Sequence, residues 1–138
     1  MYGEYEHTID AKGRMFLPSK FRTELGERVY VTMGLDGCIC IYPTEEWNKF
    51  IKKLDEVPSV RARHVKRYLC RSAVETDVDA QGRILIPLSH REKAKLGRTV
   101  TVIGVDEKAE VWNPDDFRAY SDSISDEEIT AELIELGM

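Results

Sequence analysis

The sequence contains no long run of apolar residues. Its apolar stretches, such as residues 15–17 and 84–86, are only a few residues long, whereas a membrane-spanning helix needs about 20. The acidic, polar N-terminus, MYGEYEHTID, also lacks the basic start and apolar segment of a secretory signal. We therefore expect a soluble protein that stays in the cytoplasm and has no membrane partner.

Cysteine is scarce, and its placement favours reduced thiols. The three cysteines are Cys38, Cys40 and Cys70. Cys38 and Cys40 are separated by one residue in an apparent strand, and we expect their side chains to point to opposite faces of the sheet. That arrangement suits neither a disulfide between them nor a shared metal site. We therefore predict mostly buried thiols in a reducing compartment.

The chain also lacks an excess of positive charge. Its net charge is −5, whereas a surface that binds nucleic acid is usually positive. However, residues 106–138 contain eleven acidic residues and only two basic ones, so that residues 1–105 are net positive. The overall acidity is a property of the tail and does not exclude DNA binding.

Patterns typical of catalysis are missing. There is no recognisable Ser–His or Cys–His pair, phosphate-binding glycine loop or cluster of metal ligands. Asp10 and Asp79 could in principle act as paired carboxylates, but both stand in apparent turns. We therefore predict no enzyme activity, no metal and no cofactor. An Asp10→Asn variant discriminates, because it disturbs folding if the aspartate holds a turn and only activity if it is catalytic.

The sequence does contain an internal repeat. IDAKGRMFLPSKFR, which starts at Ile9, returns as VDAQGRILIPLSHR at Val78. After a short insertion, LGERVYVT from Leu25 is matched by LGRTVTVI from Leu96. Shared aspartate, glycine, proline and arginine at matching positions indicate a duplicated module.

Each copy has the same predicted order of elements. A strand leads into a tight turn, in which the aspartate (Asp10 or Asp79) accepts backbone N–H bonds and the glycine (Gly13 or Gly82) permits positive φ. A second short strand follows. A proline then starts a short helix, which we expect to end at residues 25–26 or 96–97.

A second hairpin and several helices complete the predicted organisation. The hairpin turns at residues 36–37 in the first copy and 106–108 in the second. Apolar residues at helical spacing predict helices after Thr44 and over residues 59–72. Asn-Pro-Asp-Asp starts a helix in the second copy, and a capping box formed by Ser and Glu predicts that the acidic tail is helical.

The doubled turn resembles a known family. DAKGR and DAQGR, each followed by an aliphatic strand, a proline and a short helix, resemble the duplicated SpoVT-AbrB modules of the MraZ family. The similarity extends to EYEHTID, GLDGCICIYP and GRILIP. The resemblance implies a mainly β fold with α-helices, in which two tandem AbrB-like ββαββ modules form an intramolecular pseudo-twofold, swapped-hairpin β-barrel flanked by helices. We place the modules at residues 5–47 and 76–118, connecting helices at 48–75, and the acidic C-terminal helix at 119–138.

The resemblance also implies a function. Family members are nucleoid-associated transcriptional regulators that form ring-like homo-oligomers. They bind double-stranded DNA with short direct repeats upstream of the division and cell-wall gene cluster, and control that cluster and their own promoter. We expect the same of this chain, as a repressor or an activator.

The matching turn positions predict which residues contact DNA. Arg14 and Arg83 are expected to do so, with Lys12 and Gln81 beside them. Arginine can grip a phosphate or bind guanine O6 and N7, and glutamine can address adenine or phosphate. The alternative is that each arginine only pairs with the aspartate of its own turn. Because Lys12 is replaced by Gln81, we expect the first copy to bind phosphate more strongly.

Other basic residues are assigned to structure or assembly. Arg22 and Arg91, on the short helices, are expected to form surface salt bridges. Arg63, Arg67 and Arg71 lie four apart and share one helix face. This face could bind DNA, but we favour a subunit interface in which it meets the acidic tail or a neighbouring chain.

A protein-binding regulator is the alternative function. AbrB-like modules also occur in antitoxins that sequester a toxin through an acidic C-terminal segment. Such antitoxins usually carry one module and dimerise, whereas duplication here completes the pair within one chain. A capped, amphipathic tail helix also suits self-assembly better than a disordered segment.

Overall fold

The computed structural model describes residues 1–138. Eight strands alternate with six α-helices and one short 3-10 helix. The strands are β1 (Glu4–Thr8), β2 (Arg14–Phe16), β3 (Arg28–Met33), β4 (Ile39–Pro43), β5 (Val74–Asp77), β6 (Arg83–Leu85), β7 (Thr99–Val105) and β8 (Lys108–Trp112). The helices are η1 (Ser19–Phe21), α1 (Arg22–Leu25), α2 (Thr44–Asp55), α3 (Val60–Cys70), α4 (Leu88–Lys93), α5 (Pro114–Asp122) and α6 (Asp126–Glu135).

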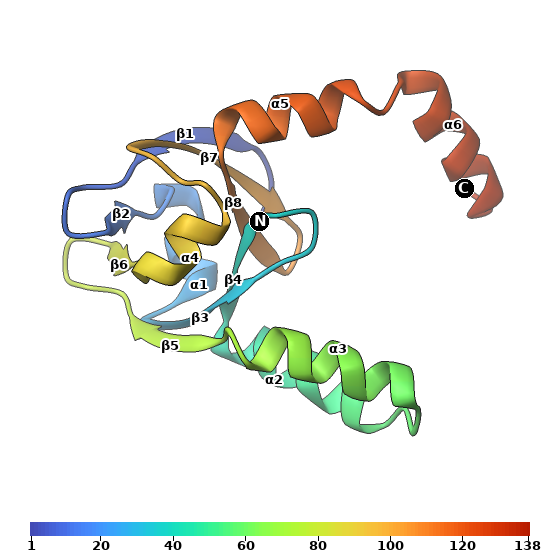
Figure 1. Cartoon of the computed structure of the whole chain (residues 1–138), viewed down its shortest axis with the longest axis horizontal. Helices are drawn as coiled ribbons and strands as arrows, with labels where there is room; N and C mark the ends of the chain where they lie inside the picture. Colours follow the sequence, from blue (N-terminus) through green and yellow to red (C-terminus); the bar gives the residue numbers. More distant parts are fainter.

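The two repeats exchange strands. A six-stranded antiparallel sheet has the order β1-β7-β8-β4-β3-β5, and β2 pairs with β6 in a separate two-stranded ribbon (Figure 1). The first strand of each repeat therefore pairs with the third strand of the other, as β1 with β7 and β5 with β3. The second and fourth strands pair with their own counterparts. The fold is mixed β and α, as predicted, and closure into a barrel stays a prediction.

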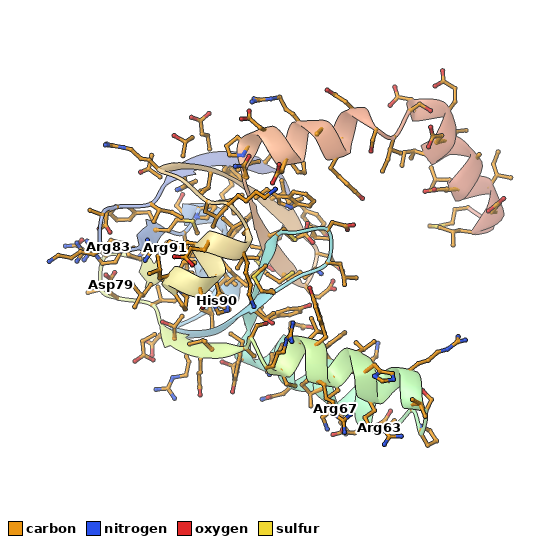
Figure 2. The ribbon with its side chains drawn as sticks, in the orientation of Figure 1. Arg63, Arg67, Asp79, Arg83, His90 and Arg91 are labelled. Atoms are coloured by element: carbon orange, nitrogen blue, oxygen red, sulfur yellow. The ribbon has the colours of Figure 1, made fainter.

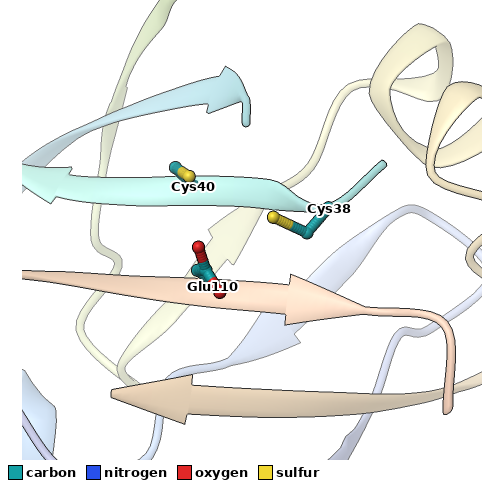
Figure 3. A group of neighbouring side chains, drawn as sticks. All are labelled: Cys38, Cys40 and Glu110. Atoms are coloured by element: carbon teal, nitrogen blue, oxygen red, sulfur yellow. The ribbon is translucent and has the colours of Figure 1, made fainter. Parts of the chain in front are cut away.

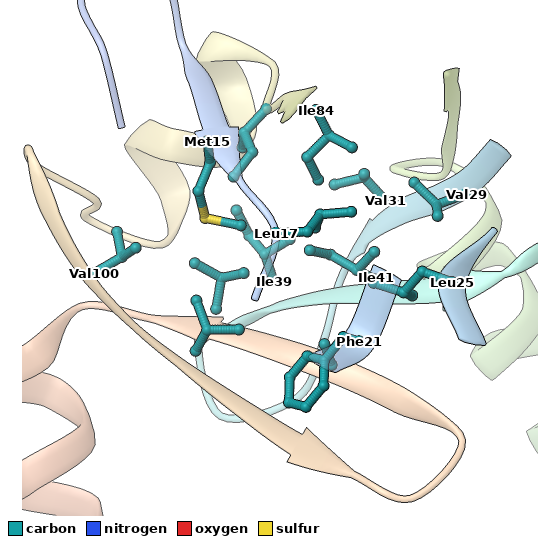
Figure 4. Packing of buried hydrophobic residues seen from close by; sticks show 14 of the residues in the cluster. Met15, Leu17, Phe21, Leu25, Val29, Val31, Ile39, Ile41, Ile84 and Val100 are labelled. Carbon is teal, nitrogen blue, oxygen red and sulfur yellow. The ribbon is translucent and has the colours of Figure 1, made fainter. Parts of the chain in front are cut away.

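One apolar core lies between the ribbon and the sheet. Alternation along the short strands turns Met15 and Ile84 inward, where they are 0% and 1% exposed. They pack against strand residues such as Val31 and Ile39, and Phe21 closes the same core (Figure 4). Burial of the inner face fixes which residues of the ribbon point outward.

The predicted turns are present, but one of the predicted helix ends is misplaced. Asp36 (φ 63°) and Gly37 (φ 82°) form the turn between β3 and β4. Gly26, at φ 78°, ends α1 as expected. The prediction that the second short helix ends at residues 96–97 was wrong. Helix α4 ends at Lys93, because Lys95 takes the left-handed conformation at φ 56° and the helix closes in a Schellman-type pattern of hydrogen bonds.

Four helices, α2, α3, α5 and α6, lie on the side of the molecule opposite the ribbon, whereas α1 and α4 lie beside it (Figure 1). Helices α2 and α3 lie side by side, and α5 and α6 form an arm that extends away from the sheet (Figure 1). The expected caps are present. Ser59 accepts from the backbone of α3, Asn113 from that of α5, and Ser125 from that of α6. Helix α6 has no buried residue. None of the helices combines the length and the apolar character that a membrane-spanning segment needs.

A second apolar cluster lies on the outer face of the sheet beneath α2 and α3. It contains Trp47 and Trp112 together with Cys38 and Cys40. The expectation that the two cysteines point to opposite faces was wrong, because residues two apart on a strand share a face. Their sulfur atoms lie with a carboxylate oxygen of Glu110 in a group no wider than 4.8 Å.

Candidate nucleic-acid interface

The two predicted turns lie side by side at the end of the molecule opposite α2, α3, α5 and α6 (Figure 1). They are joined by the ribbon, in which Arg14 pairs with Leu85 and Phe16 pairs with Arg83. Just after the ribbon, each strand also forms a backbone hydrogen bond with the turn of the other repeat. The Leu17 N–H donates to the Gly82 carbonyl at 2.9 Å, and the corresponding bond to the first turn is 2.8 Å long. The spacing of the turns is therefore set by backbone hydrogen bonds.

The same hydrogen bonds build both turns. Oδ1 of Asp10 accepts from the backbone N–H groups of Lys12 and Arg14, each at 2.9 Å. Its Oδ2 accepts from the Arg14 Nε at 2.8 Å. In the second turn, Asp79 makes the three equivalent bonds at 2.8–3.0 Å. The turn glycines have φ values of 85° and 82°, a region that other residues rarely adopt.

These contacts keep the two aspartates ionised. The backbone N–H of Arg14 is the main cause that lowers the pKa of Asp10 below its ordinary value, and the side chain of Arg14 adds to the effect. The pKa of Asp79 is lowered in the same way by Arg83. A carboxylate that stays charged holds the arginine Nε in place, so it orients the guanidinium group.

The arginines retain free donors. The side chains of Arg14 and Arg83 are 36% and 21% exposed. Only their Nε atoms are bonded, to the aspartate of the same turn. The terminal Nη groups have no protein partner, and the Arg83 guanidinium lies 5.8 Å from the centre of the Phe16 ring. Pairing with the turn aspartate and contact with an external acceptor are therefore compatible.

The outer face of the ribbon also carries apolar side chains. Phe16 and Leu85 are both 50% exposed and alternate with the two arginines. Neither residue was among the predicted DNA contacts. The signal was present, because the inward direction of Met15 and Ile84 requires their strand neighbours to point outward. Apolar groups between arginines can contact thymine methyl groups in a major groove.

Arg22 and Arg91 lie over the turn of the opposite repeat. The prediction of surface salt bridges was wrong, since neither arginine takes part in any of the molecule's ion pairs. Arg91 instead donates from Nε to the Ile86 carbonyl at 3.0 Å. A Cβ at Gly13 would lie 2.9 Å from Arg91 Nη2, and a Cβ at Gly82 would lie 2.2 Å from Arg22 Cζ. Each turn thus has a second arginine beside it, contributed by the other repeat.

The surroundings of the two turns differ in charge. A depression of about 540 Å³ beside the first turn is lined by Arg91 and Arg98, with Asp10 as its acidic residue. The depression of about 610 Å³ beside the second turn is lined by Arg22 and by three acidic residues, namely Glu27, Asp77 and Asp79. Lys12 and Gln81, both exposed, add to this difference. The first turn therefore has the more positive surroundings.

The basic helix is remote from both turns. Figure 2 shows Arg63 and Arg67 on α3, on the far side of the sheet from Arg83 and Arg91. His90, on α4, is 5% exposed, and its Nε2 lies 2.6 Å from the Ser72 carbonyl. These residues therefore do not extend the surface formed by the turns and the ribbon.

Comparison with known proteins identifies the family. The family model described as "MraZ protein, putative antitoxin-like" matches residues 1–67 and again residues 69–135. A transcriptional regulator MraZ from Thermoanaerobacter pseudethanolicus is 45% identical over 142 residues, which cover 100% of this chain and 99% of the relative. The transcriptional regulator MraZ of Lachnoclostridium phytofermentans is 44% identical over 137 residues, covering 99% and 96%.

A third relative extends the same pattern. The transcriptional regulator MraZ of Halothermothrix orenii is 43% identical over 140 residues, covering 99% of this chain and 98% of the relative. Transcriptional regulator is not the name of an enzyme class. Two consecutive matches to one family model, together with relatives that align along their whole length, establish that the chain belongs to the MraZ family.

Proposed function

We propose that the protein is a sequence-specific DNA-binding transcriptional regulator, and that the ribbon β2–β6 with its two turns contacts the duplex. The observation that carries the proposal is the pair of turns, each of which presents an oriented arginine with unbonded Nη groups. The names of the relatives support the same function.

The contacts at DNA divide into two kinds. Arg14 and Arg83 bind base edges or phosphates through their Nη groups, and Lys12 binds phosphate. Gln81 stands at the equivalent position of the second turn and contributes a neutral amide. Because a major groove admits a two-stranded ribbon, the exposed face of β2–β6 has a suitable width for it. The residues that hold the geometry of the turns without contacting DNA are Asp10, Gly13, Asp79 and Gly82.

The target we propose is a set of short direct repeats upstream of the division and cell-wall gene cluster, including the chain's own promoter. One protomer makes only a few charged contacts with DNA. A homo-oligomeric ring of modules, bounded at residues 5–47 and 76–118, engages several repeats at once and gains affinity through effective concentration.

Self-assembly is supported by two complementary surfaces away from the turns. Helix α3 and its C-cap Arg71 carry five Lys and Arg residues and no acidic ones, whereas residues 106–138 are strongly acidic. Beside α3, a groove of about 520 Å³ is lined by apolar residues that include Leu35, Phe50 and Val65. Helix α6 exposes Ile129 and Leu133. Docking of α6 from one copy against α3 of the next would bury both apolar surfaces and pair the charges.

The test is a gel-shift titration with DNA from the region upstream of the chain's own gene. The double variant Arg14→Ala, Arg83→Ala should lose affinity by about 5- to 150-fold for each arginine, as expected for loss of a bidentate contact. The matched control is Lys52→Ala, Lys53→Ala, which removes the same charge from exposed positions on α2. Equal binding by both double variants would contradict the assignment.

A protein-binding, antitoxin-like regulator is the second candidate function. The description of the family model and the exposed apolar residues of the acidic helix α6 favour it. Mass measurement by size-exclusion chromatography with light scattering separates the two. A large closed assembly supports the regulator that binds repeats, and a small species supports the antitoxin.

A further inference from the structure

Three potential metal ligands meet where the two repeats join. Cys40 lies on β4, Cys38 just precedes that strand, and Glu110 pairs with Cys40 across the neighbouring strand β8. The two Sγ atoms and a carboxylate oxygen of Glu110 all lie within 4.8 Å of one another. Figure 3 shows the three side chains gathered on one face of the sheet. We propose that this cluster binds one thiophilic divalent cation, of which Zn²⁺ is the prime example.

The donor set suits such an ion. Thiolate sulfur and carboxylate oxygen both bind Zn²⁺, at about 2.3 Å and about 2.0–2.2 Å. Donors of a tetrahedral ion with these bond lengths lie roughly 3.5–3.8 Å apart. Small side-chain rotations of Cys38, Cys40 and Glu110 therefore bring the present group to ligand spacing. The fourth position is left to water.

The three proposed ligands are largely buried, and a neighbouring side chain holds one of them by a hydrogen bond. Cys38 and Cys40 are 0% and 2% exposed, and the Glu110 side chain is 17% exposed. The Trp112 indole Nε1 donates to Glu110 Oε1 at 3.1 Å, which holds the carboxylate beside the sulfurs. Hydrogen bonds of this kind orient metal ligands and raise affinity.

Gly34 provides an independent indication that the two sulfurs need room. Its backbone does not require glycine, because its φ is not positive. A Cβ at this position would lie 2.5 Å from Cys40 Sγ and 3.0 Å from Cys38 Sγ. Glycine is therefore required by the pair of thiols, and any larger residue would occupy the space into which they point.

The site has an entry path and a competing cation. The groove beside α3 reaches Cys40 and is also lined by Lys108. Lys108 Nζ lies 3.7 Å from Glu110 Oε2, on a side chain that is 22% exposed. A divalent ion that enters the site would displace the Lys108 ammonium group from the Glu110 carboxylate. Since β4 and β8 belong to different repeats, the bound ion would cross-link them.

Titration of the reduced full-length protein with Co²⁺ tests the proposal, because Co²⁺ replaces Zn²⁺ and thiolate ligation gives it a near-ultraviolet charge-transfer band. The expected result is a band that saturates at one equivalent per chain and disappears on addition of Zn²⁺. Cys70→Ser is the matched control, since Cys70 is the exposed cysteine outside the cluster. It should leave the band unchanged.

Variants of the ligands decide the outcome. Cys38→Ser should abolish the band, and Glu110→Gln should weaken Co²⁺ binding at least tenfold while the amide still accepts the indole bond. Circular dichroism checks that each variant is folded, and Glu110→Gln carries the test if the buried cysteine variant is not. Absence of a band, its persistence in Cys38→Ser or its loss in Cys70→Ser would overturn the proposal.

Discussion

At the scale of single residues, one carboxylate in each turn performs two tasks with its two oxygens. Oδ1 of Asp10 accepts the backbone N–H bonds that shape the turn, and Oδ2 holds the Nε of Arg14. The variant Asp10→Asn separates these tasks, because the amide keeps one acceptor and places a donor toward the arginine. We expect a folded protein with a lower melting temperature and weaker DNA binding, measured by circular dichroism and gel shift. Asp10→Ala, which removes both acceptors, should lower the melting temperature further.

The same aspartates make stability depend on acid. The pKa of Asp10 and that of Asp79 are lower in the folded protein than in the unfolded chain, since backbone N–H groups stabilise the charged form. Their contribution is fully present above the unfolded pKa, near 3.9, and is lost as the pH falls through the depressed folded pKa. Urea unfolding between about pH 6 and pH 2 should show this decline. The free energy of unfolding of the double variant Asp10→Asn, Asp79→Asn should decline less over this pH range. An unchanged slope would argue against the assignment.

The difference between Lys12 and Gln81 gives a further prediction. Lys12→Gln should weaken DNA binding and reduce the salt slope of log affinity by about 0.9, the value for one released phosphate contact. Gln81→Lys should strengthen binding by a smaller amount, because acidic residues surround the second turn. Fluorescence anisotropy over a range of salt concentrations measures both. An identical slope in all three proteins would show that position 12 does not meet phosphate.

The sequence could predict which arginines belong to the turns, but not which arginines approach from elsewhere. Arg14 and Arg83 stand within the repeated motif itself. Arg22 and Arg91 reach the turn of the other repeat, and that contact depends on strand exchange, which no local pattern reports. For the same reason, the lack of acidic partners for these two residues became visible only in three dimensions.

At the scale of elements, the inner face of the ribbon contributes to stability, and its outer face is the one proposed to contact DNA. Ile84 is buried and Leu85, its neighbour, is 50% exposed. Ile84→Ala should lower the free energy of unfolding by about 2–5 kcal/mol, as removal of a buried aliphatic side chain does. Leu85→Ala should change it by less than about 0.5 kcal/mol and weaken DNA binding instead. Denaturant unfolding and gel shift together distinguish the two, and the reverse pattern would place the wrong face of β6 on the outside.

Elements whose ends are set by local sequence signals were predicted well. Elements whose ends depend on tertiary contacts were predicted less well. The helices with polar caps, such as α3, α5 and α6, begin where Ser or Asn accepts backbone bonds. The predicted end of α4 was misplaced. The left-handed residue that ends the helix is Lys95, whereas Gly97 was expected in that role. The side chain of Asn113 donates to the Lys95 carbonyl at 2.8 Å and holds that turn from a distant part of the chain.

At the scale of the whole molecule, the proposed DNA-binding surface and the charged helices α3 and α6 lie at opposite ends. Reversal of charge by Arg63→Glu and Arg67→Glu should therefore disrupt assembly while sparing the turns. Sedimentation velocity should show a smaller species, and affinity for an operator with several repeats should fall further than affinity for a single repeat. Unaltered sedimentation would exclude α3 from the interface. Arg14→Ala is the matched control, which should leave sedimentation unchanged.

If the turns bind DNA as proposed, their unequal charge would give each protomer a direction on the duplex. A dimer of identical chains has two equal halves and reads inverted half-sites. Here one gene encodes both halves, so that one turn can change without the other, as Lys12 and Gln81 illustrate. A duplex laid across the ribbon would then differ in free energy from the same duplex turned end for end. Neighbouring protomers that share this preference would line up head to tail along the helix axis.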